Sequence, residues 1–124
     1  MACNTIWLGN GILFKYSGTV TSQEVEKTMG IMSGDNRVDT RTYQISDFTD
    51  VTNNLITPED VKEIGDLDKS TSRWTSKKIR NAVITIDQQF IPIVEKYFRG
   101  FEGTAWECSI FDNLELAYEW VNRD

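Results

Sequence analysis

Residues 42–48, with the sequence Thr-Tyr-Gln-Ile-Ser-Asp-Phe, form a predicted β-strand near the middle of the chain. A helix-start pattern precedes this strand at Thr21-Ser22-Gln23-Glu24, and another follows it at Thr57-Pro58-Glu59-Asp60. Each pattern places a hydroxyl at the N-cap and an acid three residues later, and the proline stands where it costs no hydrogen bond. A strand between two helix starts predicts parallel strands joined by right-handed crossovers.

Elements outside this region continue the alternation. Two apolar runs, 6–8 and 12–14, flank Gly9-Asn10-Gly11, so the chain is expected to open as a β-hairpin, because Asn-Gly favours the positive φ angles of a tight turn. The later patterns predict a strand over 81–86, a helix over 88–99, a strand over 104–111 and a last helix capped by 112–115.

The expected fold is therefore α/β, within a single domain spanning residues 1–124. Its mixed sheet combines an N-terminal antiparallel hairpin with parallel βαβ strands, and about four helices cover it. The edge of the hairpin is available to pair with a second copy, which would give a homodimer.

Composition narrows the function classes. The formal net charge is −6, which argues against a nucleic-acid partner because phosphate binding needs clustered lysine and arginine. The uncharged first 14 residues are too short to span a bilayer, so no integral membrane segment is expected. Two cysteines and no secretory pattern predict a cytoplasmic protein without a disulfide framework.

Residues for common catalytic chemistry are missing. The chain has no histidine, no Cys-x-x-Cys pair and no glycine-rich phosphate loop, so we expect no enzyme, no cofactor and no metal site. Asp47 and Asp50, where the central strand is predicted to end, would hold a cation or exchange protons if they converged. The interpretation we favour is turn chemistry, in which these side chains bond their own backbone.

Two further features have a structural and a functional interpretation. Thr57 is a natural N-cap, and a phosphate at that helix start would also be stabilised by free N–H groups, although Glu59 and Asp60 would repel it. Aromatic residues are dense in the second half, where they either fill the core or line an apolar pocket. The pocket residues would be Trp74, Phe90, Tyr97, Phe98 and Trp106.

Three stretches resemble the SpoIIAA-like (STAS-related) family. These are Tyr43-Gln44-Ile45-Ser46-Asp47-Phe48-Thr49-Asp50-Val51-Thr52, the early Tyr16-Ser17-Gly18-Thr19-Val20-Thr21, and the ending from Ile110-Phe111-Asp112 to Trp120-Val121. The resemblance implies a STAS-like fold. In the sporulation members of this family, phosphorylation of a serine at the helix start after the central strand governs binding to a kinase-like partner. Here the matching stretch is Leu55-Ile56-Thr57-Pro58, without the family's preceding Asp and following Gly.

Together these features predict a non-catalytic regulatory or adaptor module that binds a protein partner after its central strand, with Thr57 as the candidate phosphorylation site. The residues of the expected partner loop are Asp47, Thr49, Asp50, Thr52, Thr57 and Glu59. The alternative is a binder of a small apolar or lipid-like ligand, held by the aromatic residues of the C-terminal half.

Overall fold

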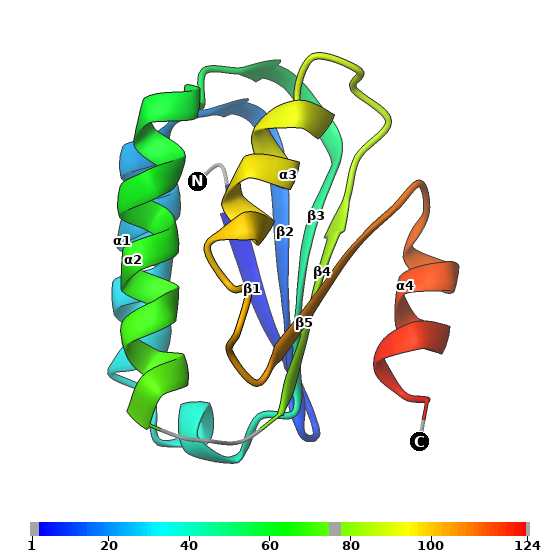
Figure 1. The fold of residues 1–124 in the computed structure, drawn as a ribbon. Coiled ribbons are helices and arrows are strands. Elements are labelled where there is room, and N and C mark those ends of the chain that lie inside the picture. Colours follow the sequence, from blue (N-terminus) through cyan, green and yellow to red (C-terminus); the bar gives the residue numbers. More distant parts are fainter. Residues whose placement is uncertain (1–2, 75–77, 124) are drawn as a thin grey trace.

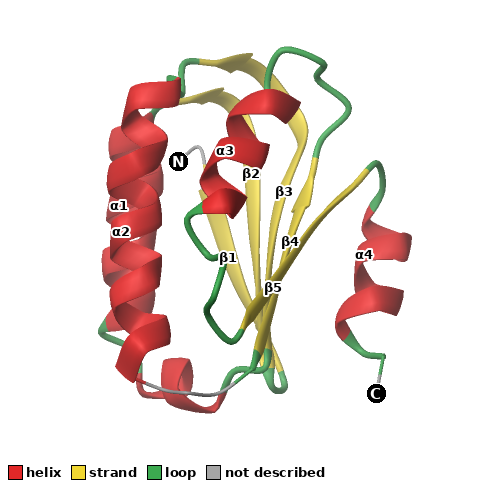
Figure 2. Cartoon of the chain, in the orientation of Figure 1, coloured by secondary structure: helices red, strands yellow, loops and turns green. Residues whose placement is uncertain are grey.

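The computed structural model describes the backbone of residues 3–74 and 78–123, with the side chains in these ranges except those of residues 67–74. A five-stranded sheet forms its centre, with the strands in chain order (Figures 1 and 2). The strands are β1 (Cys3–Leu8), β2 (Gly11–Val20), β3 (Tyr43–Asn54), β4 (Ile79–Ile84) and β5 (Trp106–Phe111). The helices are α1 (Ser22–Ser33), α2 (Pro58–Trp74), α3 (Ile91–Arg99) and α4 (Leu114–Val121), with a short 3-10 helix η1 (Asn36–Thr40) after α1.

Strand direction explains the layers. β1 is antiparallel to β2, and β2, β3, β4 and β5 run parallel to one another. Each parallel strand is added on the same side of the one before it, so right-handed crossovers place α1, α2 and α3 on one face of the sheet. α4 follows the last strand and covers the other face (Figure 1). The structure confirms the predicted mixed α/β sheet with its antiparallel hairpin and four covering helices.

Both faces of the sheet are packed. The larger core lies between the sheet and α1, α2 and α3, and α4 covers a smaller one with Ala117 and Val121. Three predicted helix starts are confirmed by their capping bonds. The hydroxyls of Thr21 and Thr57 each accept from the backbone N–H three residues later at 3.3 Å, and Asn113 accepts from Leu116 N at 2.9 Å.

β3 is longer than predicted, and this corrects the expected position of the partner loop. The strand continues past Phe48 to Asn54, although its pairing with β4 ends where Asp47 lies opposite Ile84. From there it pairs with β2 alone through two register irregularities, which break the alternation that sequence reasoning follows. Asp47 and Asp50 therefore do not mark the strand end. Thr49, Asp50 and Thr52 belong to β3 rather than to a loop.

Side chains that cap turns move three other predicted boundaries. β4 ends at Ile84 and not at residue 86, because Thr85 accepts from Asp87 N at 3.1 Å and turns the chain. Asp87 accepts from Gln89 N at 2.9 Å, so α3 begins only at Ile91. The last strand begins at 106, after Thr104 accepts from its first backbone N–H at 3.2 Å.

The hairpin turn is confirmed, although its positive φ angle lies one residue earlier than Asn-Gly suggested. Gly9 has φ +57°, while Leu8 and Gly11 face each other across a two-residue turn. Gly11 instead allows a close approach. A Cβ atom there would lie 2.0 Å from Cζ of Tyr43, so the tyrosine ring packs directly on the glycine.

β1 forms one edge of the sheet, and pairing of this edge with a second copy stays a prediction. Within residues 3–74 and 78–123, none of the helices combines the length and apolar character that a membrane crossing requires.

Replacing Gly11 by Ala should destabilise the fold by about 2 kcal/mol, because the new methyl group would overlap the Tyr43 ring. The matched control is Gly30→Ala in α1, where an added Cβ meets nothing within 4 Å. That control should gain about 0.5–1 kcal/mol from helix propensity. Urea denaturation of both variants measures the difference, and equal stabilities would contradict this account of Gly11.

Candidate functional site

The ends of the parallel strands and the starts of the helices lie at the same end of the molecule, the carboxyl edge (Figure 1). In open α/β sheets this is the edge at which ligands bind. The segment from Thr52 to Glu59 runs along it and contains three of the six predicted partner residues. Of these, Thr52, Thr57 and Glu59 are exposed.

Asp60 links the first two helices at this edge. Its Oδ2 accepts from the hydroxyl of Ser22 at the start of α1 and from that of Thr57 at the start of α2, both at 2.7 Å. The two hydroxyl donors, with Ser22 the stronger influence, hold the pKa of Asp60 below its usual range. This carboxylate therefore stabilises the relative placement of α1 and α2.

The hydroxyl of Thr57 is both a hydrogen-bond donor and an acceptor. It donates to Asp60 Oδ2 and accepts from Asp60 N, while the side chain remains exposed. The structure thus confirms the capping role that the sequence predicted for Thr57. Phosphorylation of this residue stays a prediction. A phosphate would remove the donated hydrogen and bring added negative charge close to Asp60.

Asp47 and Asp50 have separate structural partners. Asp47 is only 3% exposed and accepts from the backbone N–H of Thr49 at 2.9 Å and from its hydroxyl. This is the turn chemistry favoured from sequence, placed at a register irregularity of β3. Asp50 is exposed, with one carboxylate oxygen 3.8 Å from Nζ of Lys15. Among the residues that the structure describes, no group of three His, Cys, Asp or Glu side chains is arranged to hold a metal.

The predicted aromatic pocket does not form as one unit. Phe90 and Tyr97 line a cavity under the helices, whereas Phe98 and Trp106 line a separate groove beside β5. Tyr97 and Phe98 are consecutive on α3, so they leave the helix in different directions. Trp106 stacks on Phe101, with ring centroids 4.8 Å apart. The side chain of Trp74 lies outside the described residues.

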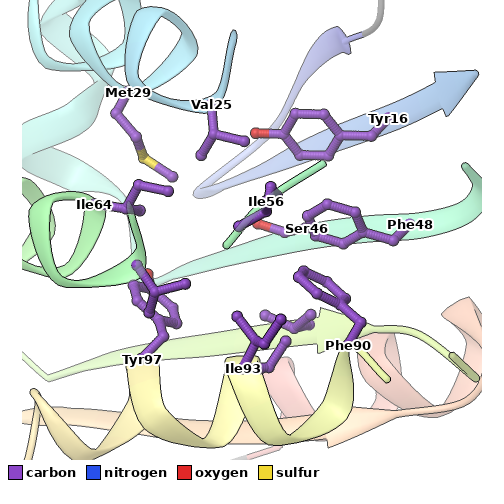
Figure 3. Close-up of a pocket in the computed structure, with 13 residues that line it drawn as sticks. Tyr16, Val25, Met29, Ser46, Phe48, Ile56, Ile64, Phe90, Ile93 and Tyr97 are labelled. Atoms are coloured by element: carbon purple, nitrogen blue, oxygen red, sulfur yellow. The ribbon is translucent and has the colours of Figure 1, made fainter. Parts of the chain in front are cut away.

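The cavity under the helices has a volume of about 50 Å³ and is almost entirely apolar (Figure 3). Phe48 lies between Tyr16 and Phe90 on one side of it, at ring-centroid distances of 4.8 Å in both cases. Its other lining residues come from β3, β4, α1, α2, α3 and the segment before α2. They are Val25, Met29, Ser46, Ile56, Val61, Ile64, Val83, Ile93, Val94 and Tyr97.

A second cavity, also about 50 Å³, lies at the carboxyl edge between the ends of β3 and β4, and sequence reasoning missed it. Its wall is mainly polar. The lining residues are Phe48, Val51, Thr52, Asn54, Thr85 and Asp87. Only the length of β3 brings 51–54 opposite 85–87, and no local pattern in the sequence signals that length.

Comparison with solved structures identifies the fold. The chain is similar to the anti-sigma factor antagonist SpoIIAA in its unphosphorylated form, with a TM-score of 0.66 and 13% sequence identity. The match covers 99% of this chain and 100% of that one. The fold is SpoIIAA-like.

A second structure with the SpoIIAA-like fold is also similar. It is an uncharacterised protein of the DUF3478 family from Shewanella loihica PV-4, with a TM-score of 0.58 and 16% identity over 97% of this chain and 92% of that one. No protein-family model matches the sequence, and no curated protein matches it significantly. The structural likeness confirms the fold that the resemblance predicted, over nearly the whole chain.

Asp60→Asn should lower the stability of the fold at neutral pH and make that stability less dependent on pH. Folding lowers the pKa of Asp60, so the ionised carboxylate stabilises the folded protein. This stabilisation is fully present above the ordinary pKa of aspartate and is lost as the pH falls through the lowered pKa of the folded protein. The variant should therefore be less stable than wild type at about pH 6, and the gap should narrow towards about pH 2.5. Urea denaturation at both pH values measures this.

The control for this measurement is Asp66→Asn, which changes an exposed carboxylate on the same helix. It should leave the pH dependence of stability close to that of wild type. A gap between wild type and Asp60→Asn that stays constant from neutral to acid pH would contradict the stabilising role assigned to the ionised Asp60.

Proposed function

We propose that this protein is a non-catalytic regulatory module of the cytoplasm that binds a protein partner at its carboxyl edge. Its fold is that of SpoIIAA, an anti-sigma factor antagonist, and such a protein acts on another protein. The absence of histidine from the chain and the separate structural engagement of Asp47 and Asp50 support a role without chemistry.

The observation that carries the proposal is the exposure of two large aliphatic side chains at this edge. Leu55, between β3 and α2, is 51% exposed, and Ile86, two residues after the end of β4, is 72% exposed. Backbone bonds hold Leu55 in place, since its N–H donates to the carbonyl of Val20 at 2.9 Å. We take these two side chains as the apolar part of a protein-binding surface, because such surfaces combine an apolar centre with a polar rim.

Charge indicates the chemistry of the partner. Glu59 follows Leu55 by four residues and Asp87 follows Ile86 directly, and both acids are exposed. The whole chain has a net charge of −6. A partner with an apolar centre and a basic rim would complement this arrangement and would associate faster at low salt. We name Thr52, Leu55, Thr57, Glu59 and Ile86 the edge surface.

Thr57 is the residue through which phosphorylation would control the edge surface. Its hydroxyl is exposed and is bonded to Asp60, which also holds Ser22 of α1. A phosphate at Thr57 would oppose the charges of Glu59 and Asp60 and would break the donated bond. The modification would therefore change both the charge of the surface and the contact between the two helix starts.

Leu55→Arg should reduce capture of the partner about tenfold or more, because a cation would replace the apolar centre of the edge surface. The measurement is quantitative mass spectrometry of proteins that co-purify with the tagged chain. The matched control is Ile31→Arg, the same change at a 59% exposed position of α1 outside the edge surface. Equal capture by wild type and both variants would refute the proposed surface.

Thr57→Glu should weaken the same capture about tenfold and lower stability by about 1 kcal/mol, because it removes the N-cap hydroxyl and adds charge beside Asp60. Thr57→Ser keeps a hydroxyl and should behave as wild type. If Thr57→Glu captured the partner as well as Thr57→Ser does, the proposal that Thr57 controls binding would be ruled out.

A further inference from the structure

We propose that the two cavities beside Phe48 form one binding site for a neutral single-chain amphiphile, an inference that goes beyond the protein-binding role. The straight aliphatic chain would occupy the apolar cavity under the helices, and the head group would occupy the polar cavity at the carboxyl edge. Phe48 lines both cavities, so a ligand that displaces its ring would extend from one into the other.

The apolar cavity fits the end of an aliphatic chain. Its wall is made of aliphatic and aromatic side chains, apart from the hydroxyls of Tyr16, Ser46 and Tyr97. The hydroxyl of Tyr97 already accepts from Asn81 at 3.0 Å. A volume of about 50 Å³ is a third of the roughly 150 Å³ that holds benzene in an engineered cavity. The cavity as it stands therefore holds only the end of a narrow chain, and displacement of the Phe48 ring would supply the remaining room.

The polar cavity has an unused hydrogen-bond donor. The Oδ1 of Asn54 accepts from Ile56 N at 3.0 Å, which fixes the orientation of this amide. Its Nδ2 is buried and donates to no group among the described residues. A buried donor without an acceptor costs free energy, so a head group that brings an acceptor oxygen would be bound favourably there.

Charge selects the kind of head group. The described lining of both cavities contains no lysine or arginine, and Asp87 contributes a carboxylate to the polar one. A carboxylate or phosphate head would therefore be repelled. A primary amide or an alcohol has an acceptor for Asn54 and a donor for Asp87 or Thr85.

Phe48 controls the passage between the cavities. Its ring stacks on Tyr16 at an interplanar angle of 12° and meets Phe90 edge-on at 60° (Figure 3). The side chain is only partly buried, unlike the strand residues before it in β3. Rotation of this ring towards solvent would join the two volumes without moving the backbone of β3.

The test is titration of the full chain with octanamide, followed by calorimetry and by NMR shifts of Ser46 and Asn54. We expect saturable binding, with octanoate binding about tenfold more weakly because its head is charged. Asn54→Asp keeps the acceptor for Ile56 N and removes the donor, so it should weaken octanamide binding about tenfold. Undetectable octanamide binding, or equal affinity for octanamide and octanoate, would overturn the proposal.

A second pair of variants tests the position of the chain. Ile93→Trp places a large ring at the partly buried wall of the apolar cavity and should weaken octanamide binding about tenfold, whereas Ile31→Trp on α1 should not. If Ile93→Trp does not fold, affinities of butanamide, hexanamide and octanamide give the same information. Affinity that is independent of chain length would refute occupation of the apolar cavity. Protein capture through Leu55 is a separate readout, so either proposal can fail alone.

Discussion

The continuation of β3 beyond its neighbour β4 is the constraint on which the carboxyl edge depends. After Asp47 the strand has only β2 as a hydrogen-bonded partner, yet it remains extended to Asn54. Asp47 supports the first irregularity through its bonds to Thr49, and the backbone of Leu55 is bonded to Val20 at the end of β2. Without this ordered extension, Val51, Thr52 and Asn54 would not line the polar cavity, and Leu55 would not be presented beside the start of α2.

The chemistry gathered at this edge is suited to binding. Hydroxyl and carboxylate groups there are used mainly to cap helices and turns, as in the Thr57–Asp60–Ser22 contact. The groups left over are apolar side chains facing solvent and one buried amide donor. The proposed module would act by forming contacts, and its regulation would come from changes in charge, as at Thr57, or from a ligand beside Phe48.

Local patterns in the sequence predicted the local structure well. The caps at Thr21, Thr57 and Asn113 follow from side chains that bond backbone groups three residues away, so they need no tertiary information. The length of β3 was missed because two irregularities break its alternation and its residues after Phe48 are mostly polar. Phe98 and Trp106 line a different groove from Phe90 and Tyr97, and this grouping depends on how α3 is rotated over the sheet. The donor of Asn54 and the exposure of Leu55 are tertiary facts, which the sequence does not encode in any short motif.

Native-state hydrogen exchange, measured by NMR at single residues, tests the ordered extension of β3 most directly. The account predicts that the amide of Leu55, which donates to Val20, and those amides of 50–54 that pair with β2 exchange slowly, as do amides in the first half of the strand. Exchange of these amides at the rate of the turn residues 100–105 would contradict the account, because the edge surface and the polar cavity would then have no fixed framework.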